Sequence, residues 1–148
     1  MPPKPGIFFS LFLFVFMINC TDDVKITKTS EIALFEAIHY PCETAKAVDK
    51  IMDEEFLDMH LYQDGMLTLV FKFSNTCGSA YTDSIVTADN MIQIALCDTS
   101  TTHYRCICTH RCTYDFELTN SEPVNINLLI KGYGQDDYTV CLDTLLVL

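Results

Sequence analysis

Short β-rich runs separated by turn residues fill the chain from Phe56 to its end and restrict the folds open to it. The runs are rich in Val, Ile, Leu, Tyr and Phe, and polar residues with Gly, Asn and Asp separate them. Such spacing predicts a mainly β domain, an antiparallel sandwich or open barrel of about seven strands. We expect the strands at residues 56–62, 66–74, 84–88, 91–97, 104–118, 124–131 and 138–147.

The first two runs are joined by Gln63-Asp64-Gly65. Asp-Gly between two β-rich runs is a strong signal for a tight hairpin, because Gly readily adopts a positive φ. We therefore expect the first two strands of the series to pair with each other.

Two segments before Phe56 have a loose helical spacing of apolar residues. The first segment spans residues 30–38 and begins with Ser30, a residue type that caps helices. The second segment spans residues 43–55. Pro41 and Cys42 separate the two. We expect one or two short helices here, with extended segments as the alternative.

The first nineteen residues have the order of a signal peptide. Lys4 precedes a mostly apolar run from Ile7 to Ile18, which is shorter than the roughly 20 residues of a membrane-spanning helix. Cys20 follows at once, where a bacterial lipoprotein signal would be cleaved and the new terminal cysteine would receive palmitate. This order predicts a lipoprotein signal peptide at 1–19, a polar tether at 20–29 and a single β-rich domain at 30–148.

The chain is acidic, with a formal net charge of −11. All 20 acidic residues but only 8 of the 9 basic ones follow Cys20, so the mature chain carries about −12. Such a surface repels phosphate backbones and anionic lipid head groups, which argues against nucleic acid as a partner. A lipid anchor is then the expected link to a membrane.

Eight cysteines are many for a chain of 148 residues. In an exported protein this density predicts disulfides, whereas in the cytosol it would suggest metal or redox chemistry. If Cys20 carries lipid, an odd number remains, so at least one has another role: Cys42, Cys77, Cys97, Cys106, Cys108, Cys112 and Cys141.

Three of these cysteines alternate with other residues in the segment 104–118. If the segment is one strand, Cys106, Cys108 and Cys112 share one face with Tyr114, Phe116 and Leu118. We expect them to be buried as small apolar side chains or to form disulfides with cysteines on neighbouring strands. The candidate partners are Cys77, Cys97 and Cys141.

A metal site is the alternative for the same segment, with Cys106, Cys108, His110 and Cys112 as ligands. In a straight strand Cys106 and Cys112 would lie about 20 Å apart, too far to share one ion. Only a tight turn near His110 would bring the four together, so we expect no metal there. A thiol-redox role for the three cysteines is the related hypothesis.

No catalytic motif stands out. The histidines are scattered, and no serine lies in a GxSxG turn. Adjacent carboxylates such as Asp136-Asp137 point to opposite faces of a strand and so form no glycosidase dyad. We therefore expect no enzymatic activity and no cofactor.

An ordered series of motifs resembles a family of uncharacterised small lipoproteins from Bacteroidetes-type bacteria. The resemblance covers Met59 to Val147, and its most specific part is the stretch Cys-x-Cys-x3-Cys-x-Tyr-Asp at residues 106–115. The other motifs are Asp64-Gly65, Asn75 to Cys77, Ile92 to Cys97 and Tyr138-Thr139-Val140, with the acidic Thr21-Asp22-Asp23 after Cys20 similar to a surface-export tag. The resemblance implies a mainly β fold and no established activity.

Together these patterns predict a cell-envelope protein with a structural or binding role, anchored by lipid in the outer membrane or at the cell surface. Its ligand would be a glycan or an envelope protein. Two alternatives remain: a secreted or periplasmic binding protein held by disulfides, and a metal-handling or thiol-redox protein that uses Cys106, Cys108 and Cys112.

Overall fold

The structure is a computed structural model that describes residues 31–42, 45–46, 56–102 and 106–148. The expected signal peptide, the lipidated Cys20 and the tether lie outside these residues. So does most of the second helix expected at 43–55.

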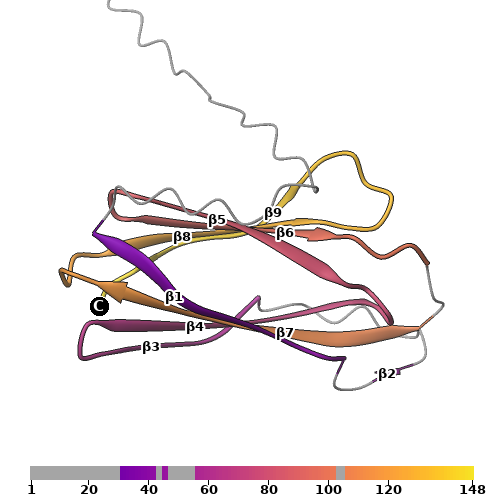
Figure 1. Cartoon of the computed structure of the whole chain (residues 1–148), viewed down its shortest axis with the longest axis horizontal. Helices are drawn as coiled ribbons and strands as arrows, with labels where there is room; N and C mark the ends of the chain where they lie inside the picture. The colour runs from indigo at the N-terminus through magenta and orange to yellow at the C-terminus, as the bar shows by residue number, and fades with distance from the viewer. Residues whose placement is uncertain (1–30, 43–44, 47–55, 103–105) are drawn as a thin grey trace, which may run out of the picture.

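Two β-sheets pack face to face and form a sandwich (Figure 1). One sheet has the order β1-β7-β4-β3, with β2 paired to β7 beyond the end of β1, and the other has the order β5-β6-β8-β9. The strands are β1 (Ile32–Tyr40), β2 (Ala45–Lys46), β3 (Leu57–Gln63), β4 (Met66–Thr76), β5 (Tyr81–Ala88), β6 (Met91–Asp98), β7 (Ile107–Leu118), β8 (Val124–Lys131) and β9 (Thr139–Leu146). The expected β-sandwich is confirmed.

The strand pairing differs from a purely antiparallel arrangement in one place. After β6 the chain crosses to the opposite sheet as β7 and then returns as β8, which pairs with β6 in parallel. Every other pair is antiparallel among the described residues. Because adjacent antiparallel strands need only a hairpin, the sequence pattern did not distinguish this return from a hairpin.

The expected hairpin at Asp64-Gly65 joins β3 to β4. Asp64 has φ 53° and Gly65 has φ 82°, the two positive values of a type I′ turn. A Cβ on Gly65 would lie 3.3 Å from the carbonyl oxygen of Leu118, so glycine also lets β7 approach the turn. The hairpin prediction is confirmed.

The helix expected at 30–38 is wrong and the extended alternative is confirmed, because residues 32–40 form strand β1 at the edge of the first sheet. β1 pairs with β7 from Ile32 opposite Leu118 to Tyr40 opposite Arg111. This pairing supplies hydrogen bonds to residues far away in sequence, and these outweigh a weak local helical pattern. In the second segment, Ala45–Lys46 is extended as well.

Alternate side chains of both sheets form one apolar core between the layers. Its largest fully buried members come from β4, β6, β7 and β8: Leu67, Leu69, Phe71, Ile92, Ile94, Leu96, Tyr114, Phe116, Ile126 and Leu128. Within the described ranges, the structure has no helix long and apolar enough to cross a membrane.

Candidate functional site

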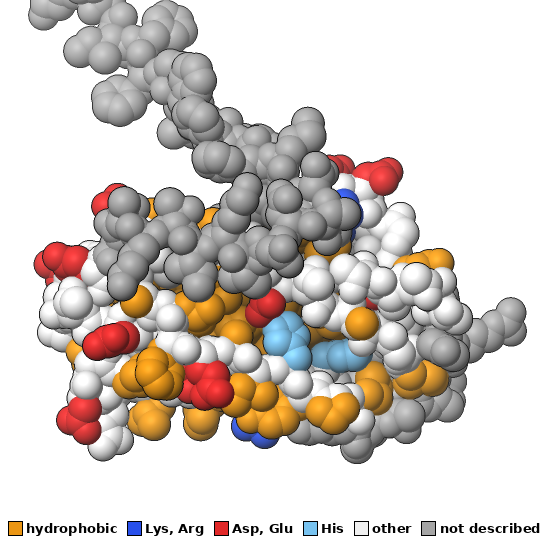
Figure 2. Space-filling view, in the orientation of Figure 1, with side chains coloured by type: hydrophobic (Ala, Val, Ile, Leu, Met, Phe, Trp, Pro, Cys, Tyr) orange, Lys and Arg blue, Asp and Glu red, His pale blue; other side chains and the backbone are white. Residues whose placement is uncertain are grey.

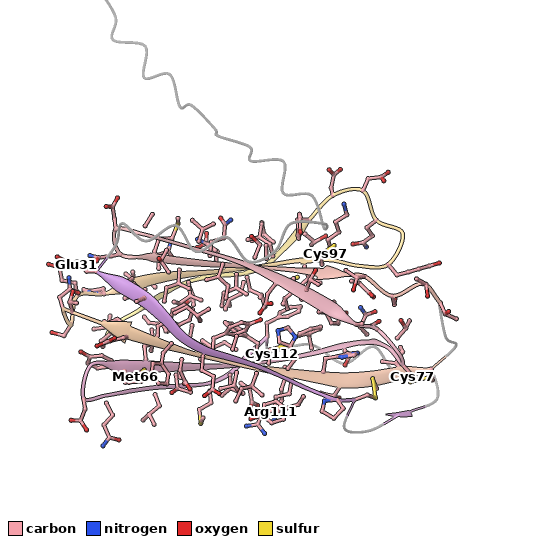
Figure 3. All side chains as sticks on the ribbon, viewed as in Figure 1. Glu31, Met66, Cys77, Cys97, Arg111 and Cys112 are labelled. Atoms are coloured by element: carbon pink, nitrogen blue, oxygen red, sulfur yellow. A yellow bond between two sulfur atoms is a disulfide. The ribbon has the colours of Figure 1, made fainter. Side chains whose placement is uncertain are left out.

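Strand β7 carries the polar groups that lie inside the sandwich. Its residues alternate between buried and partly exposed from Ile107 to Leu118, and Cys108, His110, Cys112 and Tyr114 are all on the buried side. The expectation of one shared face is confirmed for Cys108, Cys112, Tyr114, Phe116 and Leu118, whereas Cys106 lies just before the strand. Figure 3 shows Cys112 between the sheets, while Arg111 lies on the outer side of β7.

Cys77, just after β4, and Cys106, just before β7, form a disulfide. Their Cα atoms are 5.4 Å apart, and the backbone N–H of Cys77 donates a hydrogen bond to the carbonyl of Cys106. Residues directly opposite each other in an antiparallel pair have this separation, which suits a disulfide. Cys77 was one of the expected partners, so this disulfide agrees with the sequence analysis.

Cys108 pairs with Cys42, which the sequence analysis did not name as a partner. Cys42 lies between β1 and β2 in the sequence, and β2 pairs with β7 at Cys108. Because β1 and β2 both pair with β7, Cys42 lies close to β7. The other expected partners lie elsewhere. Cys97 is buried in β6, and the thiol of Cys141 in β9 donates to the carbonyl of Thr139. Two disulfides within the described part of the chain indicate an extracytoplasmic protein.

The alternative metal set of Cys106, Cys108, His110 and Cys112 is divided between different partners. Cys106 and Cys108 are in disulfides, and Cys112 is a free thiol against His39. The sulfur atoms of Cys42, Cys77 and Cys108 do lie within 4.8 Å of one another, but they belong to the two adjacent disulfides. A sulfur in a disulfide has no thiolate to offer a metal.

His39, Asp83 and Cys112 meet at the open edge where β1 of one sheet faces β5 of the other. His39 lies opposite Cys112 in the β1–β7 register, with Nδ1 3.7 Å from Cys112 Sγ. On the other side of the ring, Nε2 is 2.9 Å from Asp83 Oδ2. Tyr114 completes the cluster, with its hydroxyl 3.4 Å from His39 Nε2. The imidazole therefore lies between a thiol and a carboxylate.

This environment makes His39 a cation at neutral pH. The hydrogen bond with Asp83 is the main cause that raises the pKa of His39 from 6.5 to about 10, and the contact with Cys112 adds to it. Hydrogen bonding and charge attraction from His39 oppose the desolvation of Asp83, and the net result is a lowered pKa. Burial raises the pKa of the Tyr114 hydroxyl well above 10. The ion pair is partly open to solvent, since the side chains of His39 and Asp83 are 30% and 16% exposed.

His110, the next inward residue of β7, has the opposite character. Its ring stacks on Phe73 at 5.6 Å and meets Tyr81 edge-on at 5.3 Å. Burial lowers the pKa of His110, so the ring is neutral at pH 7. On the face seen in Figure 2, histidine side chains (pale blue) reach the surface beside an acidic side chain (red).

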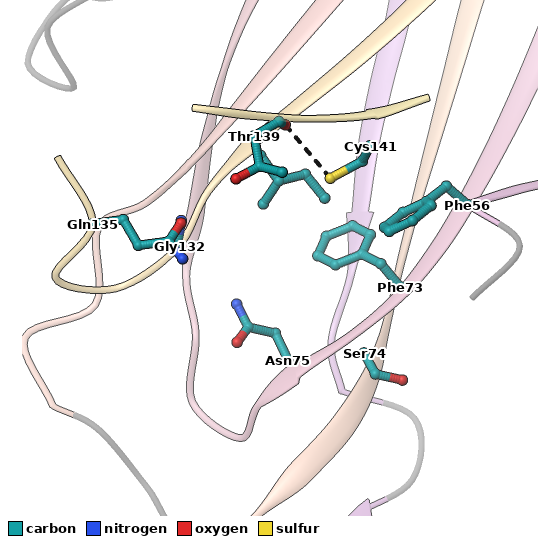
Figure 4. Close-up of a pocket in the computed structure, with 9 residues that line it drawn as sticks. Phe56, Phe73, Ser74, Asn75, Gly132, Gln135, Thr139 and Cys141 are labelled. Carbon is teal, nitrogen blue, oxygen red and sulfur yellow. Dashed lines mark hydrogen bonds between the residues drawn. The ribbon is translucent and has the colours of Figure 1, made fainter. Parts of the chain in front are cut away.

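A separate pocket opens between β4 of the first sheet and the β8–β9 end of the second (Figure 4). Its volume is about 210 Å³. Two phenylalanine rings, Phe56 and Phe73, form an apolar wall, and no charged residue lines the pocket. The polar side chains around it are Ser74, Asn75, Gln135 and Thr139.

Glycine shapes one wall of this pocket. The backbone N–H of Gly132 donates to Gln135 Oε1 at 2.9 Å, and a Cβ at Gly132 would lie 3.2 Å from the same oxygen. The lack of a side chain at Gly132 therefore lets the Gln135 amide fold back over the loop. Its Nε2 group keeps N–H bonds to donate.

The sequence analysis missed His39 and Asp83. His39 comes directly after the segment expected to be helical, and Asp83 lies just before the expected strand at 84–88. Their meeting depends on the register of β1 with β7 and on the packing of β5 over β1, and both relations join residues distant in sequence. The one local signal was the alternation that placed Cys112 on the inner face of β7.

Comparisons of the chain with protein-family models, with curated proteins and with solved structures found no match.

Proposed function

We propose that this chain is an extracytoplasmic binding protein, anchored in the outer membrane through lipid on Cys20, that takes one neutral sugar unit of a glycan into the pocket between β4 and β9. The observation that carries the proposal is the chemistry of the pocket wall. Aromatic rings on one side and uncharged amide and hydroxyl groups on the other suit a ligand with an apolar face and many hydroxyls.

The size and charge of the pocket support a small uncharged ligand. A volume of about 210 Å³ is below that of a pocket for a drug-sized molecule, and it suits a single ring. The acidic chain, at −11 overall, would repel anionic glycans. Neutral saccharides therefore fit better than acidic ones.

The Cys77–Cys106 disulfide supports a preformed site. Ser74 and Asn75, which line the pocket, lie three and two residues before Cys77, respectively, at the end of β4. Asn75 is held further, because its amide donates to the hydroxyl of Tyr81 and its Oδ1 accepts from the N–H of Thr76. A wall fixed before binding reduces the entropy lost when a ligand is bound.

Replacing Gln135 by Ala should weaken saccharide binding about three- to tenfold, because one hydrogen bond to the ligand is lost. Gln63→Ala is the matched control, since Gln63 is an exposed glutamine in the β3–β4 turn, away from the pocket. Saturation-transfer NMR of the purified protein with a panel of neutral and acidic oligosaccharides measures both. Equal affinities in the two variants, or binding of acidic sugars alone, would contradict the proposal.

Cys20→Ser should abolish acylation and leave an uncleaved or mislocalised precursor, because lipid transfer requires the thiol. Metabolic labelling with a fatty-acid probe, followed by partition into detergent, measures both effects. Cys112→Ser is the control and should label like the wild type. Equal labelling of Cys20→Ser and wild type would exclude the lipid anchor and leave the secreted alternative.

A further inference from the structure

We propose that Cys112 is a reactive thiol that His39 and Asp83 serve as a proton relay, and that it reduces small uncharged hydroperoxides and becomes a sulfenic acid. This chemistry is independent of the sugar pocket. The geometry that carries it is the line of three groups from Cys112 Sγ through the His39 ring to Asp83 Oδ2.

The order of the three groups points to proton transfer rather than to metal binding. Cys112 contacts Nδ1 at 3.7 Å, and Asp83 contacts Nε2 at 2.9 Å, so the thiol and the carboxylate lie on opposite sides of the ring. Ligands of one metal ion would have to converge on a common point. A thiol, an imidazole and an orienting carboxylate in sequence are instead the parts of an activated nucleophile.

Three strands fix this line. His39 and Cys112 lie opposite each other in β1 and β7, and Asp83 comes from β5 in the facing sheet. The Tyr114 hydroxyl, 3.4 Å from His39 Nε2, packs beside the carboxylate. The ring therefore keeps its Nδ1 toward the sulfur, and the hydrogen bond to Asp83 holds its orientation. Asp83 acts through His39 and is a positioning residue.

The surroundings of Cys112 restrict the size and charge of the oxidant that can react with its sulfur. The residue is only 2% exposed, so a bulky group cannot reach the sulfur. The partly exposed Asp83 carboxylate lies beside the His39 ring, and the chain carries a net negative charge, which disfavours anions. Cys112 is also a free thiol, in contrast to Cys108 on the same strand and Cys106 just before it. A small neutral hydroperoxide meets these conditions.

The step balances with hydrogen peroxide as the oxidant. The sulfur of Cys112 attacks one peroxide oxygen, so that an S–O bond forms and the O–O bond breaks. Sulfur loses two electrons, and the leaving oxygen is reduced to water. The His39 cation first gives its Nδ1 proton to that oxygen, and Nδ1 then accepts the proton that the Cys112 sulfur releases, so the ring ends as it began.

The test treats the purified protein, with its disulfides intact, with hydrogen peroxide and the sulfenic-acid reagent dimedone. Peptide mass spectrometry then gives the rate at which Cys112 is labelled. His39→Gln should slow that rate by about tenfold or more, because the proton relay is lost. Asp83→Asn should slow it less and change its pH profile. His60→Gln, at an exposed histidine of β3, is the matched control and should react like the wild type.

If the cluster has a purely structural role, the variants should be labelled at Cys112 faster than the wild type, not more slowly. If His39 and Asp83 only hold the sheets together, their replacement loosens the edge, exposes Cys112 and speeds labelling. Rates that rise in His39→Gln, or a wild-type Cys112 that stays unlabelled while the protein is folded, would overturn the proposal. Melting temperatures of each variant, measured alongside, show which molecules are folded.

Discussion

Replacing both Cys42 and Cys108 by serine is expected to lower the free energy of unfolding by about 4.4 kcal/mol, and replacing Cys77 and Cys106 by about 3.6 kcal/mol. The difference follows from the loops that the disulfides close, because the sequence separations are 66 and 29 residues. A longer closed loop removes more conformational entropy from the unfolded chain. Losing both should remove at most about 8 kcal/mol, which is comparable with the roughly 5–15 kcal/mol stability of a typical domain, and should leave much of the protein unfolded near 37 °C.

Urea unfolding followed by tyrosine fluorescence measures these changes under non-reducing conditions. Cys108 is 1% exposed, so Cys108→Ala should be compared with Cys108→Ser to separate the loss of the disulfide from the burial of a hydroxyl. Cys112→Ala is the matched control, because it removes a buried thiol that is in no disulfide. Equal unfolding midpoints for the wild type and both double variants would show that the disulfides do not stabilise the domain.

The stability of the wild type is expected to fall as the pH rises from about 6.5 to about 10. The pKa of His39 is 6.5 in the unfolded chain and about 10 when folded, so its contribution is complete below 6.5 and is lost by pH 10. The full shift corresponds to an upper limit of about 5 kcal/mol. Because solvent reaches the 30% exposed ring, we expect about 1–2 kcal/mol.

Asp83 determines how the stability of the folded protein changes at acidic pH. Its pKa is lowered in the folded protein, so its contribution is present above its usual value of 3.8 and is lost as the pH falls through the folded value. The His39–Asp83 pair thus contributes most between about pH 4 and 6.5. Urea unfolding at stepped pH measures the profile, and His39→Gln should flatten its alkaline slope. His60→Gln should not, which separates this pair from general charge effects.

The sequence predicted those parts of the fold that depend on neighbours along the chain. Alternation in 107–118 gave the buried face of β7, and Asp64-Gly65 gave the hairpin. It failed at residues 32–40, where the strand exists because β7 offers it a partner about 75 residues away. Local spacing carries no information on that partner.

The candidate sites show the same division. Cys77 could be proposed as a disulfide partner because the even spacing of the cysteines at residues 106–112 already suggested cross-strand contacts. The meeting of His39 with Asp83 could not, since it requires the register of one sheet and its packing against the other. The pocket wall likewise joins Phe56 and Phe73 to Gln135, from segments that only the sandwich brings together.

The parallel pairing of β6 with β8 has a consequence for how fast the molecule forms. Neither sheet is a continuous stretch of sequence, because β7 lies in one sheet while its neighbours along the chain lie in the other. The β3–β4 and β5–β6 hairpins can close early, but β7 must then find β1 and β4 across long loops. Chains dominated by such distant pairings fold in milliseconds to seconds rather than microseconds. A newly made copy therefore passes through a period in which its core strands are unpaired and its cysteines are accessible to oxidation.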